Sequence, residues 1–179
     1  AAGSDVHFVA RGSHLNAMKE QGLRVISDLG NLDIKNVVCT DDTKTIGKVD
    51  VVLVAVKLWS THDAAKSIPP LLKENTAVIS LQNGIVATDI LIPIVGKDHV
   101  VGGVSKIAAL IETPGVIRHN GLTPSLEIGE LDGKFSDRTK NFSDACKSAN
   151  INITVTEDIH TAIWSKFVFL TTMSGITTL

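Results

Sequence analysis

VDVVLVAVKLW, at residues 49–59, and TAVISLQNGI, at residues 76–85, are the two stretches that decide the fold. Each contains a largely apolar run, at residues 51–56 and 77–81, whose length predicts a strand buried on both faces. The segment between them, residues 60–73, has the length of a crossover helix, which its two consecutive prolines must break or restart. The sequence therefore predicts a β-α-β unit with parallel strands.

Each apolar run stops at a polar side chain. Lys57 follows the first run, and Gln82, Asn83 and Gly84 follow the second. Ligands of open parallel sheets bind just outside the carboxyl ends of the strands, so Lys57 and Asn83 are predicted to lie where a ligand would bind. Two plainer explanations stay open, because a lysine at a strand end can simply reach solvent and Asn-Gly is a common turn pair.

The rest of the chain extends this unit into an α/β fold. The predicted class is a Rossmann-like dinucleotide-binding sheet with helices on both faces, followed from Asp158 by a purely helical pattern. This pattern divides the chain into residues 1–157 and residues 158–179. The predicted strands are 5–10, 23–26, 34–39, 100–104 and 151–155, with an antiparallel pair 115–119 and 125–128 turning at Asn120-Gly121; the predicted helices are 14–21, 88–95 and 137–149, with a helical turn at 40–46.

Composition excludes several classes of protein. A chain of 179 residues with 44% hydrophobic residues can bury a core, and a net charge of −2 without a basic face argues against nucleic acid as a partner. No apolar run approaches the roughly 20 residues of a membrane span. Cys39 and Cys146 lack the spacing of a metal site, and a reducing, cytoplasmic location is expected. The chain opens without Met or a signal-peptide layout, as if within a domain.

Arg11 directly follows the first predicted strand. In dinucleotide-binding folds an acidic side chain near the ribose binds the 2′-hydroxyl of NAD, whereas an arginine accommodates the 2′-phosphate of NADP. Arg11 therefore favours NADP, with Ser13 and His14 as further candidate donors. The alternative is an ordinary surface arginine, since the sequence contains no glycine-rich fingerprint loop.

Lys166 lies in the middle of an apolar helix face. At 100° per residue it shares that face with Ile159, Ala162, Ile163, Phe167, Leu170 and Met173. A lysine in such a position costs stability unless it is paired or functional, and desolvation would suit it to donating a proton near neutral pH. The alternative is a lysine that reaches solvent along its own stem.

No other pattern indicates a reaction. The six histidines form no H-E-x-x-H or comparable array, so no metal site is expected. The chain has no Gly-x-Ser-x-Gly elbow and no Walker loop, so neither acyl nor phosphoryl transfer is supported. His119 and Asn120, and likewise Glu130 and Asp132, are interpreted as residues of turns.

Several motifs together resemble the ketopantoate reductase family, and they run along the whole chain in the family's order. The quoted motifs are VHFVARG (6–12), VDVVLVAVKLW (49–59), SLQNGI (80–85), PGVIRHNG (114–121), IGELDG (128–133) and AIWSKFVFLTTMSGITTL (162–179). The resemblance implies NADPH-dependent reduction of 2-dehydropantoate to (R)-pantoate, on the route to pantothenate and coenzyme A. It implies an NADP-binding domain at residues 1–157 and the beginning of a helical substrate and dimerisation domain at residues 158–179.

The resemblance also implies roles for particular residues. Arg11 would meet the 2′-phosphate of NADP, and Lys57 and Asn83 would line the nicotinamide and substrate cleft. Lys166 would be the general acid that protonates the carbonyl oxygen, with Asn83 orienting it or the substrate. Ser174 is a further candidate for contacting the small 2-oxo-acid substrate, and a homodimer is one of the assemblies that the family forms.

The chain departs from the family pattern in three places. It lacks the opening strand and its G-x-G-x-x-G/A turn, and it ends inside the first long helix of the helical domain. Four residues after Lys166, where the family often has an asparagine, it has Leu170. Two alternatives therefore stay open: another NADP-dependent 2-oxo-acid or opine-type dehydrogenase, and a non-catalytic nucleotide-sensing domain, against which Lys166 argues.

Overall fold

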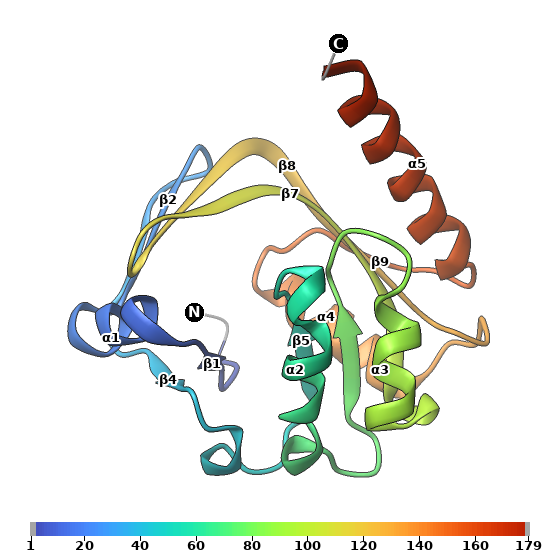
Figure 1. Ribbon diagram of the computed structural model, residues 1–179, viewed down its shortest axis with the longest axis horizontal. Helices are drawn as coiled ribbons and strands as arrows, with labels where there is room; N and C mark the ends of the chain where they lie inside the picture. Colours follow the sequence, from blue (N-terminus) through green and yellow to red (C-terminus); the bar gives the residue numbers. More distant parts are fainter. Residues whose placement is uncertain (1–2, 178–179) are drawn as a thin grey trace. The chain divides into compact units, whose positions relative to one another are not determined.

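The structure is a computed structural model that describes residues 3–177; residues 1–2 of the predicted domain 1–157 and residues 178–179 of the predicted domain 158–179 lie outside the described residues. The chain divides into two compact units (Figure 1). The first comprises the chain up to Gly47 together with Lys106–Ser125, and the second comprises Lys48–Ser105 and the chain from Leu126 onward. Each unit is described by itself.

The second unit contains the predicted β-α-β unit. Its sheet holds three parallel strands, β5 (Val51–Val54), β6 (Ala77–Ser80) and the start of β7 (Val100–Thr113), with Val51 opposite Ala77 and Val78 opposite Val100. The end of β8 (Val116–Glu130) pairs in parallel with β9 (Ile153–Val155). Three helices flank this sheet: α2 (Thr61–Lys66), α3 (Ala87–Val95) and α4 (Asp137–Ser148).

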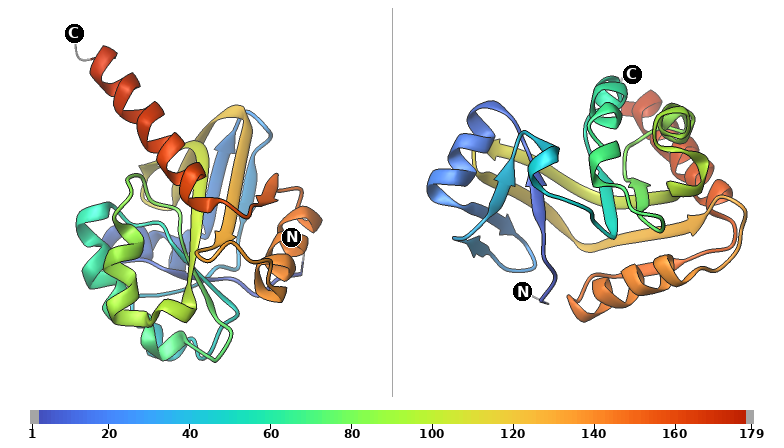
Figure 2. Two further views of the ribbon diagram at one scale, coloured as in Figure 1. Left: turned by 90° about the vertical axis from the view of Figure 1, so that its right-hand side faces the viewer. Right: turned by 90° about the horizontal axis from the view of Figure 1, so that it is seen from below.

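The helices lie on both faces of the sheet, α2 and α3 on one and α4 on the other (Figure 2, right). Alternate residues of β6 therefore face different cores. Val78 packs with residues of the α2 and α3 side, namely Val54, Ala65, Ile68, Leu91, Val95 and Val100. Ala77 and Ile79 pack with residues of the α4 side, namely Val101, Ile128, Cys146 and Ile153. The predicted α/β sheet covered on both faces is confirmed for this unit.

Burial of the two central strands differs from the prediction. Every residue of β6 is buried, as predicted, but Leu53 in β5 is 47% exposed and Val56 beyond it is 40% exposed. The reason is the strand order, because β5 is the end strand and β6 lies between two neighbours. The connection between them breaks where Pro69-Pro70 predicted, since α2 ends at Lys66 and a 3-10 turn, η3 (Pro69–Leu71), follows.

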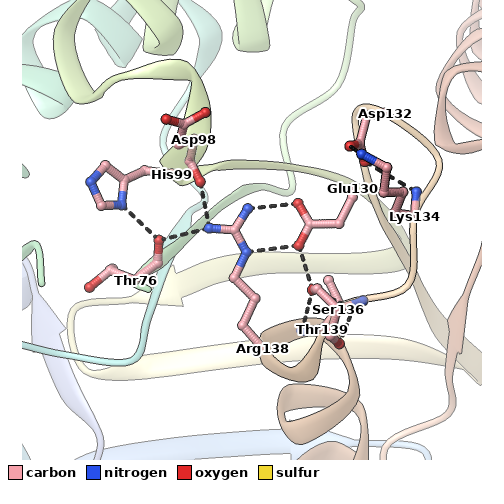
Figure 3. A network of polar contacts seen from close by, with 9 residues as sticks. All are labelled: Thr76, Asp98, His99, Glu130, Asp132, Lys134, Ser136, Arg138 and Thr139. Carbon is pink, nitrogen blue, oxygen red and sulfur yellow. Dashed lines mark hydrogen bonds and ion pairs between the residues drawn. The ribbon is translucent and has the colours of Figure 1, made fainter. Parts of the chain in front are cut away.

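A clamp built on Arg138 holds the amino ends of β6 and β7 and the carboxyl end of β8 (Figure 3). Its guanidinium makes two parallel bonds to the Glu130 carboxylate, at 2.8 and 2.6 Å, and donates to the carbonyl oxygen of Asp98 at 2.6 Å. Ser136 donates to the same carboxylate at 2.6 Å and also caps α4. The hydrogen bond to Glu130 raises the pKa of Arg138 further above its usual range. Glu130 is thus a buried ion-pair partner rather than a turn residue.

Helix α5 (Ile159–Thr177) is fixed at its first residue. Ile159 is fully buried against two glycines: a Cβ on Gly102 of β7 would lie 2.5 Å from the Ile159 side chain, and one on Gly129 of β8 would lie 3.0 Å from it. Asp158 caps the helix by accepting the Thr161 N–H at 3.0 Å, which lowers the pKa of its carboxyl group. The orientation of α5 on the sheet therefore depends on these two small residues.

The first unit holds the remaining elements. Strand β1 (His7–Val9) pairs in parallel with β4 (Val38–Thr40), and β2 (Leu23–Ser27) lies between β3 (Leu32–Ile34) and the first residues of β8. Helix α1 (Gly12–Gln21) packs near β4. A 3-10 turn, η1 (Thr43–Thr45), follows β4 along the chain. The predicted single strand 34–39 is wrong, because it is split between β3 and β4.

The predicted hairpin turn at Asn120-Gly121 is also wrong. Both residues lie inside β8, and the turn between β7 and β8 is at Gly115, whose φ is +79°. Gly121 has a positive φ of +100° within the strand, where its N–H donates to the Asp28 carboxylate at 2.8 Å. His119 is buried and bonds the Ser27 hydroxyl at 2.8 Å. Gly121, expected to form the hairpin turn, thus bonds the turn that follows β2.

Candidate functional site

Lys57 lies beyond the carboxyl end of β5. Its backbone is extended, with φ −62° and ψ 147°, and it immediately precedes a 3-10 turn, η2 (Leu58–Ser60). The side chain is exposed and has no ion-pair or hydrogen-bond partner among residues 3–177. A cation held at the end of a parallel strand, with no partner in the described chain, suits the binding of an anionic or hydroxyl group of a ligand.

Asn83 occupies the equivalent place after β6. The left-handed backbone expected of an Asn-Gly turn is taken by Gly84, with φ +96°, and not by Asn83. The Asn83 side chain is exposed and, within the described chain, its amide also has no partner. The explanation of Asn83 as a turn residue in left-handed conformation therefore does not hold, and its amide is available to a ligand.

Gln82 connects these two strand ends. Its side-chain amide donates to the carbonyl oxygen of Val56 at 2.7 Å and to the hydroxyl of Thr61 at 2.8 Å. Val56 precedes Lys57, and Gln82 precedes Asn83, so one side chain joins the loops that carry both candidate residues. The structure thus brings Lys57 and Asn83 to neighbouring positions at one edge of the sheet.

Lys166 lies on α5 above strand β7. Its ammonium donates to the carbonyl oxygen of Ser105 at 2.6 Å, and the side chain is half-buried. On the predicted apolar face Ile159 is fully buried, Ala162, Ile163, Phe167 and Leu170 are half-buried, and Met173 is 46% exposed. An ammonium has three donors, and the bond to Ser105 uses one of them to fix its direction.

A shallow depression joins the end of β6 to α5. Its lining includes Gln82 and Gly84, on either side of Asn83, and Ile163, which lies one helical turn before Lys166. The complete lining is Ser80, Gln82, Gly84, Ile85, Ala87, Thr88, Gly103 and Ile163. Packing requires a glycine at position 103, because a Cβ there would come within 2.7 Å of the Ser80 carbonyl oxygen. Neighbours of Asn83 and of Lys166 along the chain therefore line one hollow in the second unit.

The other predicted residues lie elsewhere. Arg11, in the first unit, is exposed and directly precedes α1 without capping it through its side chain. His14 is committed to structure, because its Nδ1 accepts the Gly115 N–H at 3.0 Å. Ser174 is exposed on α5, and its role as a substrate contact stays a prediction.

The two cysteines and the acidic residues offer no second site. Cys146 is buried, and burial raises the pKa of its thiol; Cys39 is half-buried, and both are free. Within residues 3–177 no group of three His, Cys, Asp or Glu side chains could hold a metal ion. In the same part of the chain no helix combines the length and apolar character needed to cross a membrane.

The sequence reasoning missed Gln82 and Thr61. Gln82 belongs to the SLQNGI motif, and a polar side chain directly after a wholly buried strand is the same signal that indicates Lys57. Thr61 is fully buried, yet nothing in its sequence context distinguishes it from any threonine that begins a helix. The role of Thr61 is visible only in the structure, through its hydrogen bond with Gln82, 21 residues away.

The geometry suits a reaction that develops negative charge. An ammonium on α5, a carboxamide after β6 and a second ammonium after β5 lie at the ligand-binding edge of a parallel sheet. Such donors stabilise an oxyanion and hold carboxylate, phosphate or ribose groups.

Comparison with known proteins gives one family. The family described as ketopantoate reductase PanE/ApbA matches residues 1–133. The 2-dehydropantoate 2-reductase of Archaeoglobus fulgidus is 34% identical over 176 residues, which are 98% of this chain and 56% of the relative. The crystal structure of 2-dehydropantoate 2-reductase from Geobacter metallireducens GS-15 has a TM-score of 0.87 and 28% identity, covering 94% of this chain and 55% of that one.

A second solved structure extends the likeness of fold. The ternary structure of D-mandelate dehydrogenase with NADH and anilino(oxo)acetate has a TM-score of 0.81 and 23% identity, over 91% of this chain and 52% of that one. At that identity the likeness concerns the fold alone. The chain spans a little over half the length of the relatives it matches. The predicted α/β class, a sheet with helices on both faces, is confirmed by the likeness to these structures.

Proposed function

The chain belongs to the ketopantoate reductase family, and on that premise we propose that the protein reduces 2-dehydropantoate to (R)-pantoate with NADPH, a step toward pantothenate and coenzyme A. The observation that supports this most strongly is Lys166, a half-buried ammonium directed by Ser105 and one helical turn beyond Ile163, which lines the same depression as Gln82 and Gly84. A non-catalytic nucleotide sensor has no need of a lysine in that position.

Lys166 is proposed as the general acid. When bound, the reduced nicotinamide supplies the hydride, which adds to the C2 carbonyl carbon of the 2-oxo acid. Negative charge then develops on the carbonyl oxygen; the Lys166 ammonium stabilises it and transfers a proton to it, which leaves a neutral amine to be reprotonated from solvent. Proton donation by a positioned side chain contributes about 10²- to 10⁴-fold to a rate.

Asn83 and Lys57 are proposed to orient the reactants. The Asn83 carboxamide can donate to the substrate or accept from Lys166, because an amide offers both kinds of group. The Lys57 ammonium can bind a carboxylate or a ribose hydroxyl at the strand end. Ser174 is proposed as a further substrate contact from α5.

Arg11 is proposed to select the cofactor. Its exposed guanidinium, at the end of β1, is suited to bidentate pairing with the 2′-phosphate that distinguishes NADP from NAD. The cytoplasmic location, the homodimer and the domain division at residue 157 remain predictions.

A second candidate is another NADP-dependent 2-oxo-acid or opine-type dehydrogenase. Leu170 favours it, because the apolar side chain stands four residues after Lys166, where the family often has a substrate-binding asparagine. An apolar contact at that place would suit a 2-oxo acid with a bulkier apolar side chain.

The test uses the protein expressed from its complete gene. NADPH and NADH are titrated by fluorescence, and oxidation of each is then followed by absorbance with 2-dehydropantoate and with a series of other 2-oxo acids. We expect NADPH to bind more tightly and to be oxidised fastest with 2-dehydropantoate. Faster turnover of another 2-oxo acid would favour the second candidate, and NADPH binding without turnover would favour a sensor.

A further inference from the structure

We propose that Gln82 is a positioning residue, which acts by holding the Lys57 loop and Asn83 in place at the carboxyl edge of the sheet. The inference rests on the proposed function of Lys57 and Asn83. It concerns a side chain that need touch neither cofactor nor substrate, and whose contacts all lie within the second unit.

The donor end of the Gln82 amide is fully used. A carboxamide NH₂ has two hydrogens, and here they reach the Val56 carbonyl oxygen at 2.7 Å and the Thr61 hydroxyl at 2.8 Å. One bond crosses from the end of β6 to the end of β5. The other reaches the first residue of α2, so a single side chain joins three elements.

The loop that carries Lys57 is held by hydrogen bonds on both sides of this residue. Thr61, which is fully buried, donates its hydroxyl hydrogen to the Leu58 carbonyl oxygen at 2.6 Å while accepting from Gln82. The Ser60 N–H donates to the Lys57 carbonyl oxygen at 2.8 Å. The carbonyl groups of residues 56, 57 and 58 therefore all accept hydrogen bonds. Gln82 donates directly to the first, and Thr61, which Gln82 holds, donates to the third.

The acceptor end of the amide fixes its orientation. Gln82 Oε1 accepts the Ser80 hydroxyl at 3.2 Å, and the Ser80 oxygen in turn lies 3.3 Å from the Gln82 N–H. Ser80 is the last residue of β6 and is buried. The side chain is thus anchored to its own strand and directed toward β5, and the adjacent Asn83 begins from a fixed backbone.

This arrangement matters because the Lys57 side chain has no partner of its own within residues 3–177. Its position is then set by the backbone that carries it. A loop already ordered before the ligand arrives avoids the entropy cost of ordering at binding, and small displacements of a positioned group can reduce a rate by about 100-fold. Gln82 therefore supplies the preorganisation that Lys57 cannot obtain from contacts of its own side chain.

Gln82→Met is the informative substitution, since methionine keeps the length and volume and removes both donors. Amide hydrogen exchange, measured by mass spectrometry on the complete protein, reports the order of the loop. We expect faster exchange in residues 55–60 of the variant, including the Ser60 amide, and no change in α4. Unchanged exchange in that loop would overturn the proposal.

Thr76→Val is the matched control. Thr76 ties the same two strands at their opposite ends, because its hydroxyl donates to the Val49 carbonyl oxygen at 2.6 Å and accepts the Lys73 N–H at 2.9 Å. Valine has the same shape without the hydroxyl. We expect this variant to lose stability as Gln82→Met does, with kcat/KM unchanged and exchange in residues 55–60 unchanged.

A double-mutant cycle separates positioning from a general structural role. We expect Gln82→Met alone to lower kcat/KM by about 10- to 100-fold, and to lower it by less than about threefold when Lys57 has already been replaced by methionine. Effects that multiply would show that Gln82 acts independently of Lys57 and would overturn the proposal. If the unmodified protein turned over no 2-oxo acid while Gln82→Met still freed the loop, the proposed function would fail and the positioning by Gln82 would stand.

Discussion

Three side chains at the candidate site differ in how they are held. Lys166 has its direction fixed by a 2.6 Å bond to the Ser105 carbonyl oxygen, as a proton donor requires. Lys57 and Asn83 are exposed and have no partners in the described chain, as expected of groups that bind a ligand. Lys166 is therefore positioned by a hydrogen bond of its own side chain, whereas Lys57 and Asn83 are positioned only by the backbone that carries them.

Arg11 allows a test of cofactor choice at the level of one residue. In Arg11→Ser we expect NADPH affinity to fall about tenfold or more while NADH affinity stays unchanged, because only the 2′-phosphate loses a charge-assisted hydrogen bond. Fluorescence titration with both cofactors measures this. Arg24→Ser is the control, since Arg24 is another exposed arginine of the first unit, 3.6 Å from Asp33. An equal loss for both cofactors would rule out the assignment.

The two thiols should differ in reactivity. Cys146 is 5% exposed and burial raises the pKa of its thiol, so less reactive thiolate is present near neutral pH. We expect a thiol reagent to modify Cys39 in the native protein and Cys146 only after unfolding, and raising the pH to leave this order unchanged. Peptide mass spectrometry identifies the modified residue. Equal labelling of both thiols under native conditions would contradict the buried position of Cys146.

At the scale of elements, the clamp around Arg138 joins the start of β6, the segment before β7, the end of β8 and the first turn of α4 (Figure 3). The Arg138 and Glu130 side chains are only 18% and 11% exposed. Replacing one member of a buried pair leaves the other charge without compensation. The clamp is therefore expected to carry much of the stability of the second unit.

Arg138→Met should lower the free energy of unfolding by about 3–5 kcal/mol, because it leaves the Glu130 carboxylate buried and unpaired. Urea unfolding followed by circular dichroism measures the change. The control is Lys140→Met in the same helix. The Lys140 and Asp144 side chains that form this ion pair are 70% and 55% exposed, so the substitution should leave the free energy of unfolding nearly unchanged. Similar losses for both variants would show that burial of the pair contributes little.

Which elements the sequence could predict depended on how local their signals were. The β-α-β unit, the break at Pro69-Pro70 and helix α4 follow from apolar periodicity and proline geometry, which are signals within a few residues. The hairpin at Asn120-Gly121 failed because the local turn signal was overridden by pairing along β8. Contacts such as that of Gln82 with Val56, 26 residues apart, leave no mark in local sequence.

At the scale of the whole molecule, the candidate site depends on how α5 is anchored. Ile159 packs on Gly102 and Gly129, and this contact sets the helix that carries Lys166 seven residues later over β7. The sequence predicted Lys166 from its place on an apolar face, but neither glycine showed in advance which strands the helix would meet. Family resemblance supplied the reaction, and the structure supplied the contacts that direct the lysine.

The most direct test of the proposed reductase compares Lys166→Met with the unmodified protein, both expressed from the complete gene. NADPH binding is titrated, and NADPH oxidation is followed with 2-dehydropantoate; Lys66→Met, which removes an exposed lysine 3.9 Å from Asp63, is the control. We predict that Lys166→Met lowers kcat by about 10²- to 10⁴-fold with little change in NADPH affinity, and that Lys66→Met changes neither. Unchanged kcat in Lys166→Met would contradict the role of Lys166 as general acid, and with it the proposed mechanism.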